Sequence, residues 1–251
     1  MKRRICQFSC GAASAVATKL TLSKFPDSII VNAYIQQEQS DNRRFLLDCE
    51  TWFGQKIIVV QNEKYAGSTY EVWKRKQFMK GRHGAPCSLE LKRSILATVK
   101  APGDIYVIGF TVEESDRFHT LCERFPEETF EAPLIAANLS KSDCFALIDK
   151  AGIILPLMYR LGYSNANCVG CPKGGQNYWQ KIRRDYPAQF AEIQQIQEDI
   201  GLGAGFLAFR SGPRKGERMM LKDLPAGDGN LPDEMEEFSC SYFCEEVKEM
   251  P

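Results

Sequence analysis

Short runs of β-branched and apolar residues alternate with helix-length segments along the first half of the chain. The expected strands span residues 5–9, 28–33, 57–60, 105–110 and 133–136, and the expected helices span residues 11–24, 41–54, 70–80, 89–99 and 113–124. Parallel strands need a crossover connection, which a helix usually provides. The sequence therefore predicts an α/β fold with a parallel five-stranded, Rossmann-like sheet and helices on both of its faces.

The alternating pattern ends in the second half of the chain. We expect residues 1–150 to form the α/β domain, and residues 151–251 to form a cysteine knuckle and a cysteine-rich C-terminal extension packed on the same core. Ser140, with Asp143 three residues later, is typical of a helix N-terminus near the end of the first part. Glycine- and proline-rich stretches after about residue 199 indicate loops.

The composition restricts the class of protein. The 32 basic and 32 acidic residues cancel, so the net charge gives no reason to expect nucleic-acid or membrane binding. No run reaches the roughly 18 apolar residues of a spanning helix, and Gln7, Ser9 and Ser14 interrupt any signal-peptide core. We expect a cytoplasmic homo-oligomer without a membrane partner. In a reducing compartment, ten cysteines favour metal or redox chemistry over a disulfide framework.

The first expected strand ends in a turn of small residues that leads directly into a helix. Small side chains let N–H groups at a helix N-terminus approach a phosphate, and the helix dipole favours the anion. Ligands of parallel α/β sheets lie beyond the carboxyl ends of the strands. Turns of this kind also occur in domains that bind no phosphate, and Thr111 equally fits ordinary helix capping. The expected cofactor-binding residues are Ser9, Cys10, Gly11, Ala12, Ala13, Ser14, Asn32, Gly109 and Thr111.

The strongest motif is the Cys-x-x-Cys pair Cys168 and Cys171, which has glycines within and after it. Such a pair forms a tight knuckle that directs two thiolates at one metal, although a redox pair and two unrelated core cysteines are alternatives. Cys87 precedes an expected helix, and Cys240 and Cys244 lie in the extension. The knuckle with both tail cysteines fits zinc, whereas the knuckle with Cys87 and one tail cysteine fits a [4Fe–4S] cluster. The other cysteines are expected to be small buried hydrophobes: Cys6, Cys10, Cys49, Cys122 and Cys144.

The first turn resembles a known family loop. The spacing Ser9-x-Gly11-x-x-Ser14 resembles the pyrophosphate-binding loop of the adenine nucleotide alpha hydrolase superfamily. Within that superfamily it is most similar to the phosphoadenosine phosphosulfate (PAPS) reductase group. The resemblance covers residues 5–190.

The cysteine motifs extend this resemblance. The segment from Pro86 to Lys92 is similar to the first cluster-binding element of bacterial adenylylsulfate reductases, with proline in place of one cysteine. Cys168 and Cys171 are similar to the second element. Residues 152–190 resemble reductase-like proteins of phages and prophages.

The resemblance implies an enzyme that binds an adenine nucleotide, which is PAPS, adenosine 5′-phosphosulfate (APS) or ATP. It implies sulfur transfer or sulfonucleotide reduction, with a thiol as the electron donor. The implied metal centre is a [4Fe–4S] cluster, or zinc, on three matching cysteines and a tail cysteine. The candidate catalytic residues are Lys92 and Lys173, which adjoin the cysteine motifs and would stabilise anionic oxygens, and Cys240 as a nucleophile. The metal ligands are Cys87, Cys168, Cys171 and Cys244.

Two departures from the family pattern bear on the reaction. Ala13 stands where ATP-cleaving members of the superfamily have an aspartate that helps to hold Mg²⁺. The chain also lacks the C-terminal Glu-Cys-Gly-Leu-His type motif that carries the reductase nucleophile.

Two further functions remain open. A sulfur-modifying enzyme of tRNA or DNA would use the basic segments 74–93 and 173–184, with Trp179 in its docking face. A non-catalytic, zinc-stabilised nucleotide-binding adaptor would also fit both departures.

Overall fold

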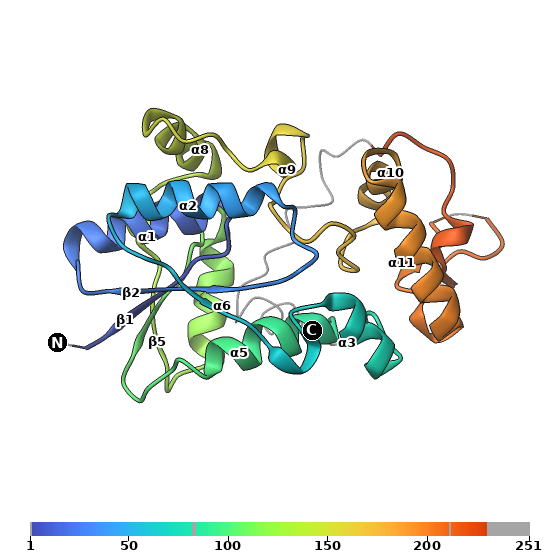
Figure 1. Cartoon of the computed structure of the whole chain (residues 1–251), viewed down its shortest axis with the longest axis horizontal. Coiled ribbons are helices and arrows are strands. Elements are labelled where there is room, and N and C mark those ends of the chain that lie inside the picture. Colours follow the sequence, from blue (N-terminus) through green and yellow to red (C-terminus); the bar gives the residue numbers. More distant parts are fainter. Residues whose placement is uncertain (1, 82–83, 211, 230–251) are drawn as a thin grey trace.

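The central element, which lies between layers of helices in Figure 1, is a parallel sheet. Its five strands follow the order β3-β2-β1-β4-β5. The computed structural model describes residues 2–81, 84–210 and 212–229. In register, Ile5 of β1 pairs with Ile29 of β2 and with Tyr106 of β4. The predicted α/β class and five-stranded parallel sheet are thereby confirmed. The strands are β1 (Arg4–Gln7), β2 (Ile29–Ala33), β3 (Ile58–Val60), β4 (Ile105–Val107) and β5 (Thr129–Glu131).

Helices cover both faces of the sheet because successive strand side chains point to opposite sides. Cys6 of β1 faces a core that contains Cys49 and Cys144, from α2 (Asp41–Phe53) and α8 (Lys141–Lys150), and residues of α1 (Ala12–Lys24). The neighbouring Ile5 faces a second core, which contains Leu121 of α6 (Ser115–Arg124) and Leu96 of α5 (Ser94–Ala97). Two expected helix ends are confirmed, namely the left-handed Gly54 after α2 and the Ser140–Asp143 capping box before α8.

The prediction of a strand at residues 133–136 is wrong. Residues Pro133–Ala136 form the short helix α7, and the fifth strand lies just before it at β5. Proline has no N–H to donate to a strand ladder, whereas it suits the first turn of a helix. The edge position of β5 is held by Arg4, whose Nη2 lies 2.8 Å from Glu131 Oε1.

The helix expected over residues 89–99 is interrupted. The segment consists of α4 (Pro86–Ser88), the π-helical turn η2 (Leu89–Arg93) and α5. A π-helical turn inside a longer helix is rare and frequently lies at a functional site. Cys87 and Lys92 both belong to this interrupted helix.

The second half of the chain packs against the first through its own hydrophobic core. α10 (Gln176–Asp185) and α11 (Pro187–Ile200) share this core with α3 (Thr69–Lys76), which lies in the first 150 residues (Figure 1). Of the described helices, none has the length and hydropathy that crossing a membrane requires. The remaining elements are η1 (Glu63–Tyr65), η3 (Val112–Glu114), α9 (Leu157–Arg160), η4 (Leu202–Ala204), β6 (Leu207–Ala208), β7 (Arg218–Met219) and η5 (Leu221–Asp223).

Candidate functional site

The turn between β1 and α1 is shaped by its two serines. Ser14 Oγ accepts a hydrogen bond from the Ser9 N–H at 3.2 Å and donates one to the Gly11 carbonyl at 2.8 Å. Cys10 has a left-handed backbone with φ of 57°, and its side chain is buried. Gly11, the residue before α1, has no side chain that could cap the helix. The turn therefore brings the first N–H groups of the helix to the carboxyl end of β1, as expected for an anion site.

Gly109 lets the end of β4 approach this turn closely. A Cβ atom built on Gly109 would lie 2.8 Å from both the N and the Cα of Ser14. Real Cβ atoms do not make contacts of that length, so the approach requires glycine. The structure thus brings Ser9, Ser14 and Gly109 together at the point where the strand order reverses.

Tyr159 of α9 covers the turn, which the sequence did not indicate. Its hydroxyl oxygen accepts a hydrogen bond from the Ala12 N–H at 3.3 Å. Burial raises the pKa of Tyr159 to about 12. A neutral hydroxyl oxygen thus takes the place that a phosphate oxygen would take at the start of α1.

A small cavity of about 20 Å³ lies at the ends of β1 and β2. Ser9, Asn32, Glu38 and Lys92 are among its lining residues. Asn32 is only 2% exposed, and its Nδ2 donates to the Phe8 carbonyl at 2.9 Å. Its Oδ1 is buried and has no hydrogen-bond partner among the described residues. The cavity therefore holds a desolvated acceptor, and Lys92 is another of its lining residues.

Lys92 and Glu38 form a buried ion pair in this cavity. Lys92 Nζ lies 3.4 Å from Glu38 Oε1, and Asn42 Nδ2 donates to the other carboxylate oxygen at 3.3 Å. Burial raises the pKa of Glu38 above its usual range, and the charge of Lys92 partly opposes this rise. Lys92 reaches this place from the π-helical turn η2.

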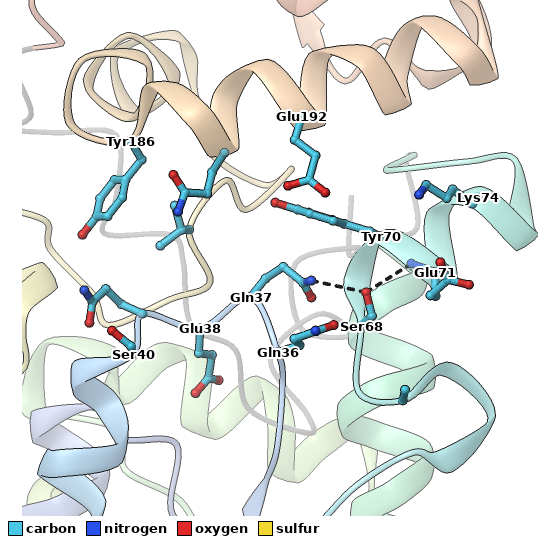
Figure 2. A pocket seen from close by; sticks show the side chains of 14 residues that line it. Gln36, Gln37, Glu38, Ser40, Ser68, Tyr70, Glu71, Lys74, Tyr186 and Glu192 are labelled. Carbon is cyan, nitrogen blue, oxygen red and sulfur yellow. Dashed lines mark hydrogen bonds between the residues drawn. The ribbon is translucent and has the colours of Figure 1, made fainter.

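A larger cavity of about 540 Å³ adjoins the first and shares Glu38 with it. The loop after β2, helix α3 and helix α11 surround it (Figure 2). It is lined by Gln36, Gln37, Glu38, Gln39, Ser40, Ala66, Ser68, Tyr70, Glu71, Lys74, Val169, Tyr186, Gln189 and Glu192. The Glu38–Lys92 pair therefore lies where the two cavities meet.

The cysteine knuckle borders the larger cavity. The Val169 N–H donates to the Gln37 carbonyl at 2.9 Å, next to the backbone bridge between Glu38 and Cys168. The buried hydroxyl of Tyr178 accepts from the N–H groups of Gly170 and Cys171 at 3.0 Å each and donates to the Cys168 carbonyl at 2.9 Å. The knuckle is thus held in shape by one tyrosine and attached to the loop after β2.

The expected metal centre is incomplete in the described part of the chain. Cys87, Cys168 and Cys171 are buried in the same hydrophobic core. Within the described ranges, however, no group of three or more His, Cys, Asp or Glu side chains could hold a metal ion. The described residues therefore do not fit a four-thiolate site by themselves. Cys240 and Cys244 lie outside the described residues.

Other expected residues lie away from the two cavities. Thr111 forms a capping box with Glu114 and lines neither cavity, and half-buried Lys173 follows the knuckle. Trp179 is fully buried in the core, so it is not available to stack on nucleic acid. The eight described cysteines form no disulfide. As expected, Cys6, Cys10, Cys49 and Cys144 are buried, while Cys122 is half-buried.

No protein-family model matches the chain, and a search of the curated proteins returns no match.

Proposed function

We propose that this chain is a PAPS reductase-like enzyme that binds an adenine nucleotide at the carboxyl ends of β1, β2 and β4. The observation that carries the proposal is the buried Oδ1 of Asn32, which has no hydrogen-bond partner among the described residues and belongs to a cavity that Ser9 and Lys92 also line. Leaving such an acceptor unpaired costs about 1–3 kcal/mol. A donor on a ligand, such as an amino group of adenine or a ribose hydroxyl, would offset that cost.

The phosphate end of the nucleotide would lie at the start of α1. The start of α1 favours an anion, and the Tyr159 hydroxyl that accepts from the Ala12 N–H would give way to a phosphate or sulfate oxygen. Lys92 would bring positive charge to the same ligand. Ala13 offers no carboxylate for a metal, so PAPS or APS fits this turn better than metal-assisted ATP cleavage.

The reaction we propose is sulfur transfer or sulfonucleotide reduction with a thiol donor. The proposed metal ligands are Cys87, Cys168, Cys171 and Cys244. A [4Fe–4S] cluster on these thiolates would supply electron transfer, whereas a zinc ion would only stabilise the fold. Lys173 and Cys240 keep their proposed roles of anion stabiliser and nucleophile. Iron and sulfide analysis of protein purified without oxygen tests the centre, because stoichiometric zinc would exclude the cluster.

Calorimetric titration of the full chain with PAPS, APS and ATP, with and without Mg²⁺, tests the nucleotide site. The proposal expects saturable binding of at least one of them without a need for Mg²⁺. It also expects Asn32→Ala to weaken that binding about tenfold or more, the effect of one buried hydrogen bond. Melting temperatures measured in parallel separate lost binding from lost folding. Absence of binding by all three nucleotides would refute the proposal.

A further inference from the structure

The larger cavity has the dimensions and the chemistry of a second ligand site. Its volume of about 540 Å³ falls within the roughly 300–1,000 Å³ of small-molecule sites. Side-chain amides are unusually frequent in its lining, where Gln36, Gln39 and Gln189 accompany two tyrosines, Tyr70 and Tyr186. Amides offer a donor and an acceptor side by side, which suits ligands that present both.

The charges that line the cavity disfavour an anionic ligand. Among the described residues, Lys74 is the one cation that lines it, against Glu38, Glu71 and Glu192. Glu38 faces Lys92 from the neighbouring cavity, and Glu71 Oε2 lies 3.7 Å from Arg75 Nε. The lining therefore has no positive excess, so a phosphate or sulfate group would be poorly held inside it.

Part of the lining is occupied by internal bonds and part is available to a ligand. Gln37 Oε1 accepts from the Thr69 N–H at 2.7 Å, and Gln37 Nε2 donates to Ser68 Oγ at 3.2 Å. This amide is therefore engaged within the protein and has a structural role in the cavity wall. Gln36 and Gln189 are exposed, and no side-chain hydrogen bond holds either amide within the described part of the chain. These two amides come from opposite walls.

Tyr70 and Glu192 face each other across the cavity. Figure 2 shows the Glu192 carboxylate, from α11, above the Tyr70 hydroxyl, from α3. The charge of Glu192 adds to the burial that raises the pKa of Tyr70, which agrees with their closeness. Tyr186 adds a second ring on the side of the loop after β2. A flat ligand can thus contact aromatic surface while its edge meets a carboxylate and amides.

We infer that the larger cavity binds a nucleobase, a planar ring that carries amino and carbonyl groups on its edge. Glu192 would accept from an exocyclic amino group, the amides of Gln36 and Gln189 would pair with ring nitrogens and carbonyls, and the tyrosines would contact the ring. The evidence for this binding site is the cavity alone. A role for it as the site of the molecule that accepts sulfur rests on the proposed function, since Glu38 borders both cavities and would place this base beside the bound nucleotide.

The base can belong to a free nucleoside or to an unpaired residue of a nucleic acid. The last turn of α3 carries Lys74, Arg75 and Lys76, of which Lys74 lines the cavity, and this basic turn could meet a sugar–phosphate backbone. The two sources share the same recognition chemistry inside the cavity. They differ in whether binding falls steeply with salt.

Binding measurements on the full chain test the inference. Adenosine, cytidine, guanosine and uridine serve as uncharged probes, a mixed single-stranded oligoribonucleotide as the polymeric probe, and putrescine as an amine without a ring. We expect saturable binding of an amino-bearing nucleoside or of the oligonucleotide, weakened about tenfold by Glu192→Gln, which removes one charge-assisted bond. Glu198→Gln on the same helix, outside the cavity, is the matched control and should leave binding unchanged. Gln189→Ala should also weaken binding.

The outcomes separate this inference from the proposed function. Salt-sensitive binding of the oligonucleotide with weak nucleoside binding supports a nucleic-acid source, and salt-insensitive nucleoside binding supports a free one. Binding of putrescine alone, binding of no probe, or equal affinities of Glu192→Gln and wild type would overturn the inference. Loss of nucleoside binding in Asn32→Ala but not in Glu192→Gln would place the base in the smaller cavity, and would overturn the inference while leaving the proposed function intact.

Discussion

The Lys92 ammonium lies 3.4 Å from a carboxylate oxygen of Glu38, and the two side chains are only 9% and 6% exposed. The pair joins the π-helical turn to the loop after β2, at the boundary between the two cavities. Burying two charges is costly, so the removal of one partner would leave an uncompensated buried charge.

Replacing Lys92 by methionine should destabilise the protein by about 3 kcal/mol, because the buried Glu38 carboxylate would lose its bonded ammonium. Adding Glu38→Gln to that variant should restore most of the loss. Urea unfolding of the wild type, both single variants and the double variant measures the coupling. If the free energy of unfolding of Lys92→Met differs from that of wild type by less than about 0.5 kcal/mol, Lys92 and Glu38 do not form a buried ion pair.

Gly109→Ala should lower the free energy of unfolding by about 1–3 kcal/mol, since the added Cβ would meet the backbone of Ser14 at 2.8 Å. Nucleotide affinity should fall with it because the start of α1 would move. Gly203→Ala is the control, as a Cβ there meets nothing within 4 Å. Equal unfolding midpoints for the two variants would show that Gly109 does not approach the backbone of Ser14 closely.

Asp104 should contribute to acid sensitivity. Arg3 donates to both of its carboxylate oxygens, at 2.8 and 2.6 Å, and these bonds lower the pKa of Asp104. A lowered folded-state pKa adds stability above the unfolded value of about 3.9, and that stability is lost as the pH falls through the folded-state pKa.

Asp104→Asn should therefore cost about 1 kcal/mol near pH 7, a modest figure because Arg3 is partly exposed. The same variant should show a flatter loss of stability between about pH 5 and pH 2. The exposed Asp27→Asn serves as the control. If the stability of Asp104→Asn and of wild type falls equally steeply with pH, the lowered pKa of Asp104 does not contribute to acid sensitivity.

Tyr178→Phe should loosen the cysteine knuckle. The variant leaves two buried N–H groups and the Cys168 carbonyl without their partner, at a cost of about 2 kcal/mol. Alkylation of Cys168 and Cys171, followed by mass spectrometry, should then be faster than in wild type. The half-buried Tyr34→Phe should leave the rates unchanged. Unaltered alkylation of Tyr178→Phe would mean that the knuckle holds its own shape.

The sheet could be predicted from sequence because its strands are short β-branched runs separated by helical segments. The same pattern placed Ser9, Asn32 and Gly109 at strand ends, where they indeed lie close to one another or to the small cavity. It failed at residues 133–136, where a short apolar run fits a helical turn as well as a strand. It also could not distinguish a π-helical turn from an α-helix within residues 89–99.

The rest of the candidate site depends on tertiary contacts that no local pattern reveals. Glu38 belongs to a polar run of glutamines and looks like part of an exposed loop, and its burial follows only from packing against Lys92 and the knuckle. Tyr70 and Glu192 meet across a cavity built from segments far apart in the chain. Tyr159 reaches the first turn from α9, and a lone tyrosine in sequence carries no sign of that role.

Amide hydrogen exchange with and without saturating PAPS, APS or ATP tests the nucleotide site most directly. A nucleotide bound at this site should slow exchange at the N–H groups of Ala13 and Ser14 and at the end of β2 around Asn32. Exchange that stays unchanged in these segments, while nucleotide binding is seen by calorimetry, would contradict the proposed nucleotide site.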